Sequence, residues 1–173
     1  MVQLSHFDEK FSKEKFPVIL LLDNITGEAN IGSIFRLADA FNVEKIVFSG
    51  TEPNLNSRRL HKTARNTHKT VTHEFTENTI NFIQNSKANC DVYALEITSG
   101  SIPIEDFHYS EDHKGIILIL GNEVSGINKE LLKISDKHLH INMFGRNSSM
   151  NVAQAAGIAL YEISKTIFAF AKK

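Results

Sequence analysis

The chain has 173 residues, 42% of them hydrophobic and 23% charged, and its formal net charge is −1 at neutral pH. A charge this close to zero excludes nucleic-acid binding by bulk positive charge, but it is compatible with a local basic patch on the surface. The length suits one buried core, so we expect a single domain over residues 1–173 with a short lead-in over residues 1–16.

Composition also bears on the compartment of the protein. The single cysteine, Cys90, permits neither an internal disulfide nor a cysteine metal cluster, and we expect it to pack as a small hydrophobic residue. The N-terminus lacks the basic and then apolar pattern of a signal peptide, and no apolar run approaches the ~20 residues that span a bilayer. We therefore expect a cytoplasmic protein.

The first half of the chain alternates predicted strands and helices. Pro17 opens an apolar run over residues 18–22, which predicts a buried strand. A turn-rich loop over residues 23–30 precedes a predicted helix, and Arg36 lies outside the apolar stripe of that helix. The stripe comprises Ile31, Ile34, Phe35, Ala38 and Phe41. The remaining elements of this half are strands at 45–49 and 69–75 and a helix at 76–86, which Thr76 is expected to cap.

The second half continues the same alternation. Strands are predicted at 92–97 and 115–120, the latter apolar on both faces, and a short helix at 128–134. The closing strand, at 138–142, is joined through a polar loop to a long apolar helix that Asn151 opens. Core strands that are apolar on both sides and alternate with helices indicate an α/β fold, with a mainly parallel sheet flanked by helices.

Three polar, glycine-bearing loops follow strands of this predicted sheet, at 24–32, 121–126 and 145–151. Ligands of such sheets bind beyond the carboxyl ends of the strands, so we expect the three loops to form one site. The chain lacks the GxGxxG, Walker A and HExxH motifs of dinucleotide enzymes, kinases and zinc hydrolases. His138 and His140 share one strand face, but a third ligand is not evident, and we expect no metal site.

The arginines supply a second indication of function. None of the five lies in a predicted core segment, and no acidic residue occurs between Glu52 and Glu74, where three of them cluster with lysines. Arginine forks match phosphate geometry, so this one-signed stretch favours contact with a nucleic-acid backbone over a merely solvated loop. The candidate RNA-binding residues are Arg58, Arg59, Lys62, Arg65, Lys69 and, in the third loop, Arg146.

Taken together, the three loops resemble the motifs of the SpoU-type ribose methyltransferases of the SPOUT superfamily, over nearly the whole chain. The matching residues are Asn30, Gly32 and Arg36 in NIGSIFR, Gly121, Glu123 and Gly126 in LGNEVSG, and Ser149, Met150 and Asn151 in SSMNVAQAAGIALYE. The segment 65–67 also resembles the family's loop over the site. Asn142 stands where the family commonly has proline, and Met150 where it commonly has leucine, so these departures concern the subfamily more than the chemistry.

The resemblance implies a SPOUT-type α/β knot with a C-terminal trefoil knot, a topology that general connection rules make very rare. It also implies S-adenosylmethionine as the cofactor, bound in the knotted loops without a metal. Apolar side chains would pack the adenine, and glycines would let backbone donors approach. The expected cofactor-binding residues are Leu95, Gly121, Asn122, Gly126, Ile141, Met143, Ser149 and Met150.

The implied reaction is methyl transfer to a ribose 2′-hydroxyl of tRNA or rRNA. The expected catalytic residues are Arg36, Asn30, Ser149, Asn151 and Glu123. In the family the arginine is proposed as the base, but a pKa above ~12 makes it a poor one, and we prefer a role in holding phosphate or stabilising alkoxide charge. Asn30 would cap the first helix and orient the guanidinium. Glu123 would either orient donors in the site or bond the backbone of the next helix.

The last helix is apolar on several sides, with Ile158, Tyr161 and Phe168 outside its small-residue stripe. We therefore expect it to pack against a partner as well as its own sheet, and the resemblance likewise implies a homodimer. A catalytically silent, knotted RNA-binding module is the alternative function, and the presence of Asn30 and Arg36 disfavours it. A non-RNA nucleotide-binding protein is a third possibility, disfavoured by the basic segment.

Overall fold

The computed structural model describes residues 15–109 and 115–170, so the predicted lead-in lies almost entirely outside them. Within these residues, parallel strands form one sheet of order β3-β2-β1-β6-β4-β7-β5. The strands are β1 Phe16–Asp23, β2 Val43–Ser49, β3 His73–Thr76, β4 Cys90–Leu95, β5 Ile102–Pro103, β6 Gly115–Leu120 and β7 Lys137–His140. The α-helices are α1 Glu28–Ala40, α2 Arg58–Ala64, α3 Thr79–Ser86, α4 Lys129–Ile134 and α5 Val152–Phe170, and the 3₁₀ turns are η1 Thr67–Lys69 and η2 Ile104–Asp106. The predicted parallel α/β sheet is therefore confirmed.

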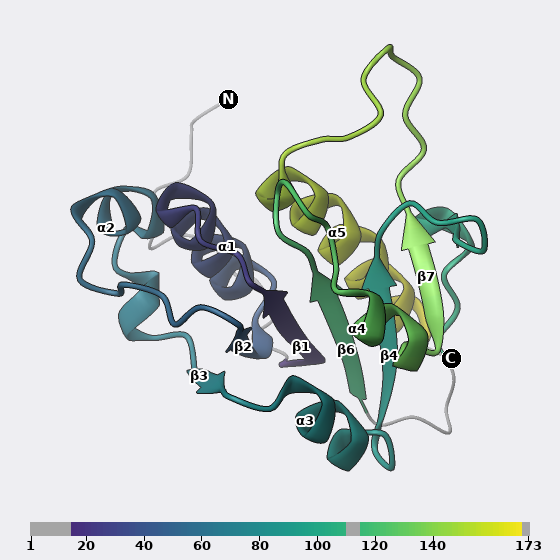
Figure 1. Cartoon of the computed structure of the whole chain (residues 1–173), viewed down its shortest axis with the longest axis horizontal. Helices are drawn as coiled ribbons and strands as arrows, with labels where there is room; N and C mark the ends of the chain where they lie inside the picture. The colour runs from purple at the N-terminus through teal and green to yellow at the C-terminus, as the bar shows by residue number, and fades with distance from the viewer. Residues whose placement is uncertain (1–14, 110–114, 171–173) are drawn as a thin grey trace, which may run out of the picture.

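Helices cover both faces of the sheet, because its central strands carry apolar residues on both sides (Figure 1). The face that carries Leu20 of β1 packs against α1, α2 and α5. The opposite face, which carries Leu21, packs against Ile83 of α3 and Leu131 of α4. Each fully buried side chain of this size contributes about 1.5–3 kcal/mol relative to an exposed one, so the central strands anchor the fold.

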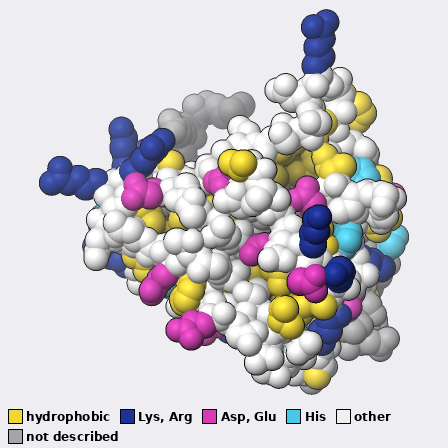
Figure 2. All heavy atoms as spheres, in the orientation of Figure 1, with side chains coloured by type: hydrophobic (Ala, Val, Ile, Leu, Met, Phe, Trp, Pro, Cys, Tyr) yellow, Lys and Arg dark blue, Asp and Glu magenta, His cyan; other side chains and the backbone are white. Residues whose placement is uncertain are grey.

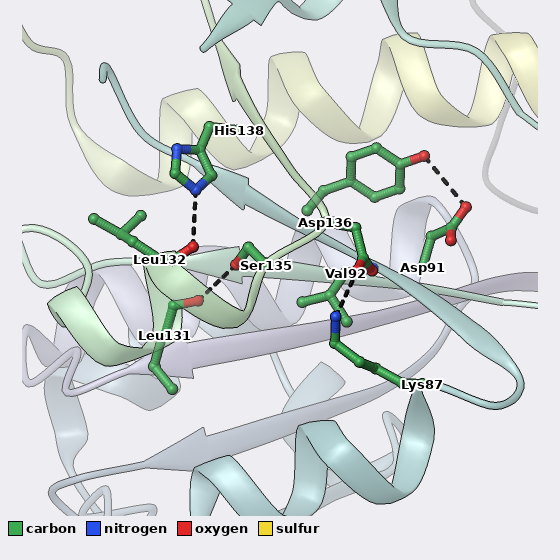
Figure 3. A network of polar contacts seen from close by, with 9 residues as sticks. Lys87, Asp91, Val92, Leu131, Leu132, Ser135, Asp136 and His138 are labelled. Atoms are coloured by element: carbon green, nitrogen blue, oxygen red, sulfur yellow. Dashed lines mark hydrogen bonds and ion pairs between the residues drawn. The ribbon is translucent and has the colours of Figure 1, made fainter. Parts of the chain in front are cut away.

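A polar network ties β7 to β4 at the amino end of both strands (Figure 3). Asp136 accepts hydrogen bonds from the Val92 backbone N–H at 2.8 Å and from Lys87 Nζ at 2.5 Å, and its own N–H donates to the Val92 carbonyl. The Ser135 hydroxyl donates to the Leu131 carbonyl, which closes the end of α4. These bonds fix where the last strand enters the sheet, between β4 and β5. The trefoil knot stays a prediction.

Of three predicted helix starts, two need correction and one is confirmed. The first helix begins at Glu28, with Gly27 at its N-cap, so Asn30 lies inside the first turn and is not the cap. The predicted cap Thr76 instead ends β3, and Asn78 caps α3 by accepting from the Asn81 N–H. Asn151 does open α5, because its side chain accepts from the first free N–H groups of the helix.

The segment around the basic residues also differs from prediction. Residues 69–75 were expected to form a strand, but they begin in the turn η1, and only β3 is extended. The stretch before them is helical, as α2, whose cap Ser57 accepts from two backbone N–H groups. Its short length and its two buried residues, Leu60 and Ala64, give too weak a period to be recognised in the sequence. In the described part of the chain, no helix has the length and hydrophobicity needed to span a membrane.

Candidate active site

A cavity of about 510 Å³ lies beyond the carboxyl ends of β4, β6 and β7. All of the residues expected to bind the cofactor line it, namely Leu95, Gly121, Asn122, Gly126, Ile141, Met143, Ser149 and Met150. Side chains of α5 and of the loop after β4 complete its wall. Its volume falls within the roughly 300–1,000 Å³ typical of small-molecule sites. The structure thus brings the second and third predicted loops together around one cavity.

Glycine is required where the second loop turns back on itself. A Cβ on Gly121 would lie 2.5 Å from the Gly126 carbonyl carbon and from the Ile127 nitrogen, both of them backbone atoms. Gly126 has a φ of +67°, a backbone conformation that other residues adopt only with strain. Asn122 and Gly126 exchange backbone hydrogen bonds across this turn. The loop is therefore a tight turn that exposes its backbone to the cavity.

Two carboxylates hold the end of this loop from either side. Glu96, directly after β4, accepts from the Ile127 N–H at 3.2 Å, and Asp23, at the end of β1, accepts from the Asn128 N–H at 2.7 Å. Because β6 lies between β1 and β4, the two side chains flank the strand from which the loop departs. Glu96 also lines the cavity, and sequence analysis missed it. The predicted strand at 92–97 included Glu96, whereas β4 ends at Leu95; a charged residue near the carboxyl end of an otherwise apolar strand was the signal that could have identified it.

A chain of polar side chains connects all three loops. Asn30 Nδ2 donates to Glu123 Oε1 at 2.5 Å, and Asn151 Nδ2 donates to Asn30 Oδ1 at 2.9 Å. Gly27 makes room for this arrangement, since a Cβ there would lie 2.8 Å from Glu123 Oε1. Glu123 therefore bonds a side chain of the first loop rather than the backbone of the next helix. These bonds bring three of the predicted catalytic residues together at the edge of the cavity.

Arg36 and Ser149 occupy different positions relative to this cluster. Ser149 lines the cavity. Arg36 is exposed on α1, off its buried stripe, and is not among the residues that line the cavity. Within the described chain no bond joins Arg36 to Asn30, whose amide bonds to Glu123 and Asn151 instead. The expectation that Asn30 orients the guanidinium is therefore wrong in this arrangement.

The basic segment, residues 57–69, lies beside α1. Its predicted RNA-binding residues Arg58, Arg59, Lys62, Arg65 and Lys69 are all exposed. Arg65 and Asn66 follow α2 in left-handed backbone conformations, which turn the chain sharply. Gly32 lets α1 and α2 approach closely, because a Cβ there would lie 2.5 Å from the Leu60 carbonyl oxygen and would clash with the Thr63 hydroxyl. Figure 2 shows dark-blue side chains extending from this end of the molecule.

A histidine stack lies under the basic segment. The rings of His61 and His68 are parallel, with centroids 4.4 Å apart, and His68 also meets the edge of Phe35. His68 is buried, and its Nδ1 has no hydrogen-bond partner in the described structure. Burial, followed by the charges of His61, Lys69 and His73, lowers the pKa of His68 below its usual 6.5. The packing around His68 therefore favours the neutral imidazole over the protonated one.

The other titratable residues singled out by the sequence have structural contacts. His138 bonds the Thr98 hydroxyl and the Leu132 carbonyl (Figure 3), and His140 bonds the Ser101 hydroxyl. No group of three potential metal ligands occurs within residues 15–109 and 115–170. Cys90 packs against the core on the sheet face that carries Leu21, as expected. Burial raises the pKa of its thiol, which disfavours the reactive thiolate.

The chain is similar in sequence to known tRNA and rRNA methyltransferases. Residues 17–161 match the model of the SpoU rRNA methylase family. An uncharacterised tRNA/rRNA methyltransferase of Borreliella burgdorferi is 31% identical over 92% of this chain and 68% of its own. A tRNA (guanosine(18)-2′-O)-methyltransferase of Aquifex aeolicus is 27% identical over 94% of this chain and 76% of its own.

Solved structures give the same relationship. The crystal structure of the Aquifex aeolicus TrmH/SpoU tRNA modifying enzyme superposes with a TM-score of 0.81 at 27% identity, covering 92% of this chain and 79% of that one. An AdoMet-bound rRNA methyltransferase from Sinorhizobium meliloti superposes with a TM-score of 0.79 at 26% identity, covering 91% of this chain and 62% of that one. The family match spans all three loops that the Glu123, Asn30 and Asn151 contacts join, and the chain belongs to the SpoU rRNA methylase family.

Proposed function

We propose that this chain is an S-adenosylmethionine-dependent RNA methyltransferase that modifies a ribose 2′-hydroxyl of tRNA or rRNA. The observation that carries the proposal is the joining of the three loops by Glu123, Asn30 and Asn151 at the edge of a cavity suited to a nucleoside cofactor. The related Aquifex protein is named as a 2′-O-methyltransferase, and the related Sinorhizobium structure contains AdoMet. Both agree with the chemistry of the cavity.

The residues that line the cavity fit this cofactor. Leu95, Ile141 and Met150 offer apolar surface to an adenine ring, and the backbone of the Gly121 turn offers hydrogen-bonding groups beside it. Ser149 offers a hydroxyl, and Glu96 offers acceptor oxygens to ribose hydroxyls. When bound, S-adenosylmethionine supplies an electrophilic methyl group on a sulfonium.

The protein's task is then to align a ribose hydroxyl and assist its deprotonation. Methyl transfer would form a bond between the 2′-oxygen and the methyl carbon as the carbon–sulfur bond breaks, and the hydroxyl proton would pass to water. The bonded chain of Glu123, Asn30 and Asn151 holds amide groups in one orientation at the cavity edge, where they can position the ribose. Arg36 is exposed on α1 and lies outside the cavity lining. Its guanidinium is therefore free to contact an RNA phosphate, and to stabilise the negative charge that develops on the 2′-oxygen.

RNA contacts are proposed for the basic segment and for Arg146. Their side chains are exposed and bear one sign of charge, and α2 is fixed to α1, the helix that carries Asn30 and Arg36. The segment can therefore grip the RNA backbone while the ribose lies at the cavity. Phosphate contacts of this kind position the nucleic acid without reading its sequence.

A homodimer is proposed from the surface of α5. Tyr161 is 58% exposed and Ile158 is 40% exposed on this helix, although its opposite side is fully buried. A second copy of the chain would remove these apolar groups from water. Sedimentation at micromolar concentration is expected to give twice the chain mass. A mass equal to one chain would contradict this part of the proposal.

The function is tested by methyl transfer itself. The protein is incubated with methyl-labelled S-adenosylmethionine and separate pools of tRNA and rRNA that lack the modification, and the RNA is then hydrolysed with alkali. We expect label in dinucleotides that resist hydrolysis, because a 2′-O-methyl group prevents cleavage at that ribose. Label in bases would contradict ribose specificity. Binding of RNA and cofactor without any transfer would instead identify the silent RNA-binding module.

A further inference from the structure

Two hydrophobic side chains beside the cavity are almost fully exposed to water. Phe144 is 98% exposed and Val124 is 97% exposed, the highest values among the large hydrophobic residues that the structure describes. Phe144 belongs to the loop between β7 and α5, and Val124 to the tight turn after β6. Each loop also lines the cavity. Exposed apolar groups gathered at the edge of a site indicate a surface that another molecule covers.

The loop that carries Phe144 projects from the carboxyl edge of the sheet, toward which β4, β6 and β7 point (Figure 1). Its two ends, at Met143 and Ser148, line the cavity. Its tip does not. There Phe144 and Arg146 border a separate recess of about 290 Å³. The aromatic ring therefore lies outside the cavity, on the residue that follows Met143, which lines it.

The chemistry around Phe144 distinguishes between possible occupants. Arg146 is the only charged residue between 141 and 161, and it lies two positions from Phe144. Figure 2 shows a dark-blue side chain standing at the tip of this loop. An aromatic ring beside an unopposed cation complements single-stranded nucleic acid, whose bases stack and whose phosphates are anionic. On α5 the cation near Tyr161 and Phe168 is Lys165, which is paired with Glu162 at 2.9 Å, so the apolar side chains of that helix lie beside a neutralised charge and suit a protein partner better.

We propose that Phe144 stacks on a nucleobase adjacent to the nucleotide whose ribose is methylated, and that Arg146 pairs with a phosphate beside that base. This inference rests on the proposed function and deepens it, because it adds a contact with a base to the phosphate contacts of the basic segment. The target nucleotide is then expected in a single-stranded loop, since bases within a helix are already stacked on their neighbours and only unstacked bases are free to stack on a side chain.

The absence of tryptophan from the chain provides a direct test. A Phe144→Trp variant contains a single tryptophan at the proposed stacking position, and Ile80→Trp is the control, at an exposed position of α3 outside the cavity lining and the proposed dimer surface. Bulk tRNA and bulk rRNA serve as probes. We expect either RNA to quench the emission of Trp at position 144 strongly and that of Trp at position 80 much less, and we expect high salt to reverse the quenching.

Affinity measurements supply the second readout. Phe144→Leu keeps an apolar side chain but removes the ring, and we expect RNA affinity to fall by about fivefold to a hundredfold, the range for removal of one base stack. Phe144→Tyr is expected to preserve the affinity. The affinity for S-adenosylmethionine should not change in either variant, because Phe144 does not line the cavity.

The outcomes separate this inference from the proposed function. If wild-type protein methylates RNA but Phe144→Leu binds RNA as tightly, the stacking contact is wrong while the function stands. If Trp at position 144 is quenched by RNA but wild-type protein transfers no methyl group, the function fails and the contact stands. An emission change that follows protein concentration without RNA would assign the tip to a second copy of the chain and overturn the proposal.

Discussion

The cavity and the basic segment are held in place by different kinds of contact. Around the cavity, the decisive hydrogen bonds join residues far apart in sequence, such as Asp23 to Asn128 and Glu123 to Asn30. In the basic segment the hydrogen bonds are local, as in the Ser57 cap. That segment is attached to the rest of the molecule mainly by packing of α2 and His68 against α1.

This difference indicates a division of labour. A network of long-range bonds fixes the cavity loops against one another, which suits a small ligand that must be held precisely enough to react. A locally bonded segment packed on one helix suits a long polyanion, which tolerates small shifts in position. Substitutions should therefore separate cofactor binding from RNA binding, with effects that range from abolished binding to a small change in stability.

The largest effect is expected for Gly121→Ala, which should break the cavity and leave the basic segment intact. The added methyl group would overlap two backbone positions of the same tight turn, so the loop must move. We expect binding of S-adenosylmethionine to be abolished in calorimetry while RNA is still bound. Gly100→Ala is the control, since its Cβ would meet nothing within 4 Å. Unchanged cofactor affinity in Gly121→Ala would show that this turn does not form the site.

Arg36→Ala tests the helix that connects the two regions. Arg36 has no packing role on α1, so we expect thermal stability, dimer mass and cofactor affinity to stay close to wild type. The methyl-transfer step should slow by roughly a hundredfold or more if the guanidinium stabilises charge that develops only in the transition state. Arg36→Lys should recover little, because a point charge cannot replace the planar fork. Near-wild-type single-turnover rates in the alanine variant would refute the assignment.

The double variant Arg58→Gln, Lys62→Gln tests the basic segment alone. We expect weaker RNA binding, and a plot of log affinity against log salt that is shallower by about 0.7–0.9 for each RNA phosphate that the variant no longer neutralises. Cofactor affinity should be unchanged. The control, Lys129→Gln with Lys133→Gln, removes the same charge from exposed positions at α4. If RNA affinity falls equally in both double variants, general charge rather than this segment attracts the RNA.

The smallest effect concerns the stability of the basic segment below neutral pH. Because the folded state lowers the pKa of His68, the unfolded chain binds a proton more readily as the pH falls through 6.5. His68 therefore stabilises the fold fully above pH 6.5, and this contribution decreases between 6.5 and the lower pKa of the folded state. Each kcal/mol of reduced stability lowers the unfolding temperature by about 2–4 °C in a chain of this size.

The variant His68→Phe is expected to unfold at a temperature that depends less on pH than wild type between about pH 7.5 and 5.5, on either side of the ordinary histidine pKa. The phenyl ring keeps the stack and the contact with Phe35 but cannot take up a proton. His108→Gln, at an exposed position, is the control and should follow wild type. Equal pH dependence in all three proteins would mean that protonation of His68 does not oppose folding.

Sequence reasoning succeeded where one local pattern determines the structure. The apolar run of β6 is buried on both faces, so its bounds, Gly115–Leu120, matched the prediction. The three loops met at one edge because parallel strands place their carboxyl ends together. Reasoning failed where the outcome depends on distant partners. Asn30 has the chemistry of a helix cap, but its bonds with Glu123 and Asn151 are contacts that no local pattern encodes.

The close approach of α1 to α2 at Gly32 has a consequence for which nucleotide of a bound RNA lies at the cavity. Because the Gly32 backbone rests directly on α2, the separation between the basic side chains and Asn30 cannot vary as it would across a flexible linker. Once a phosphate is bound on α2, this fixed separation determines the number of nucleotides between that phosphate and the ribose at the cavity. Target choice in this protein would thus depend on spacing along the RNA strand.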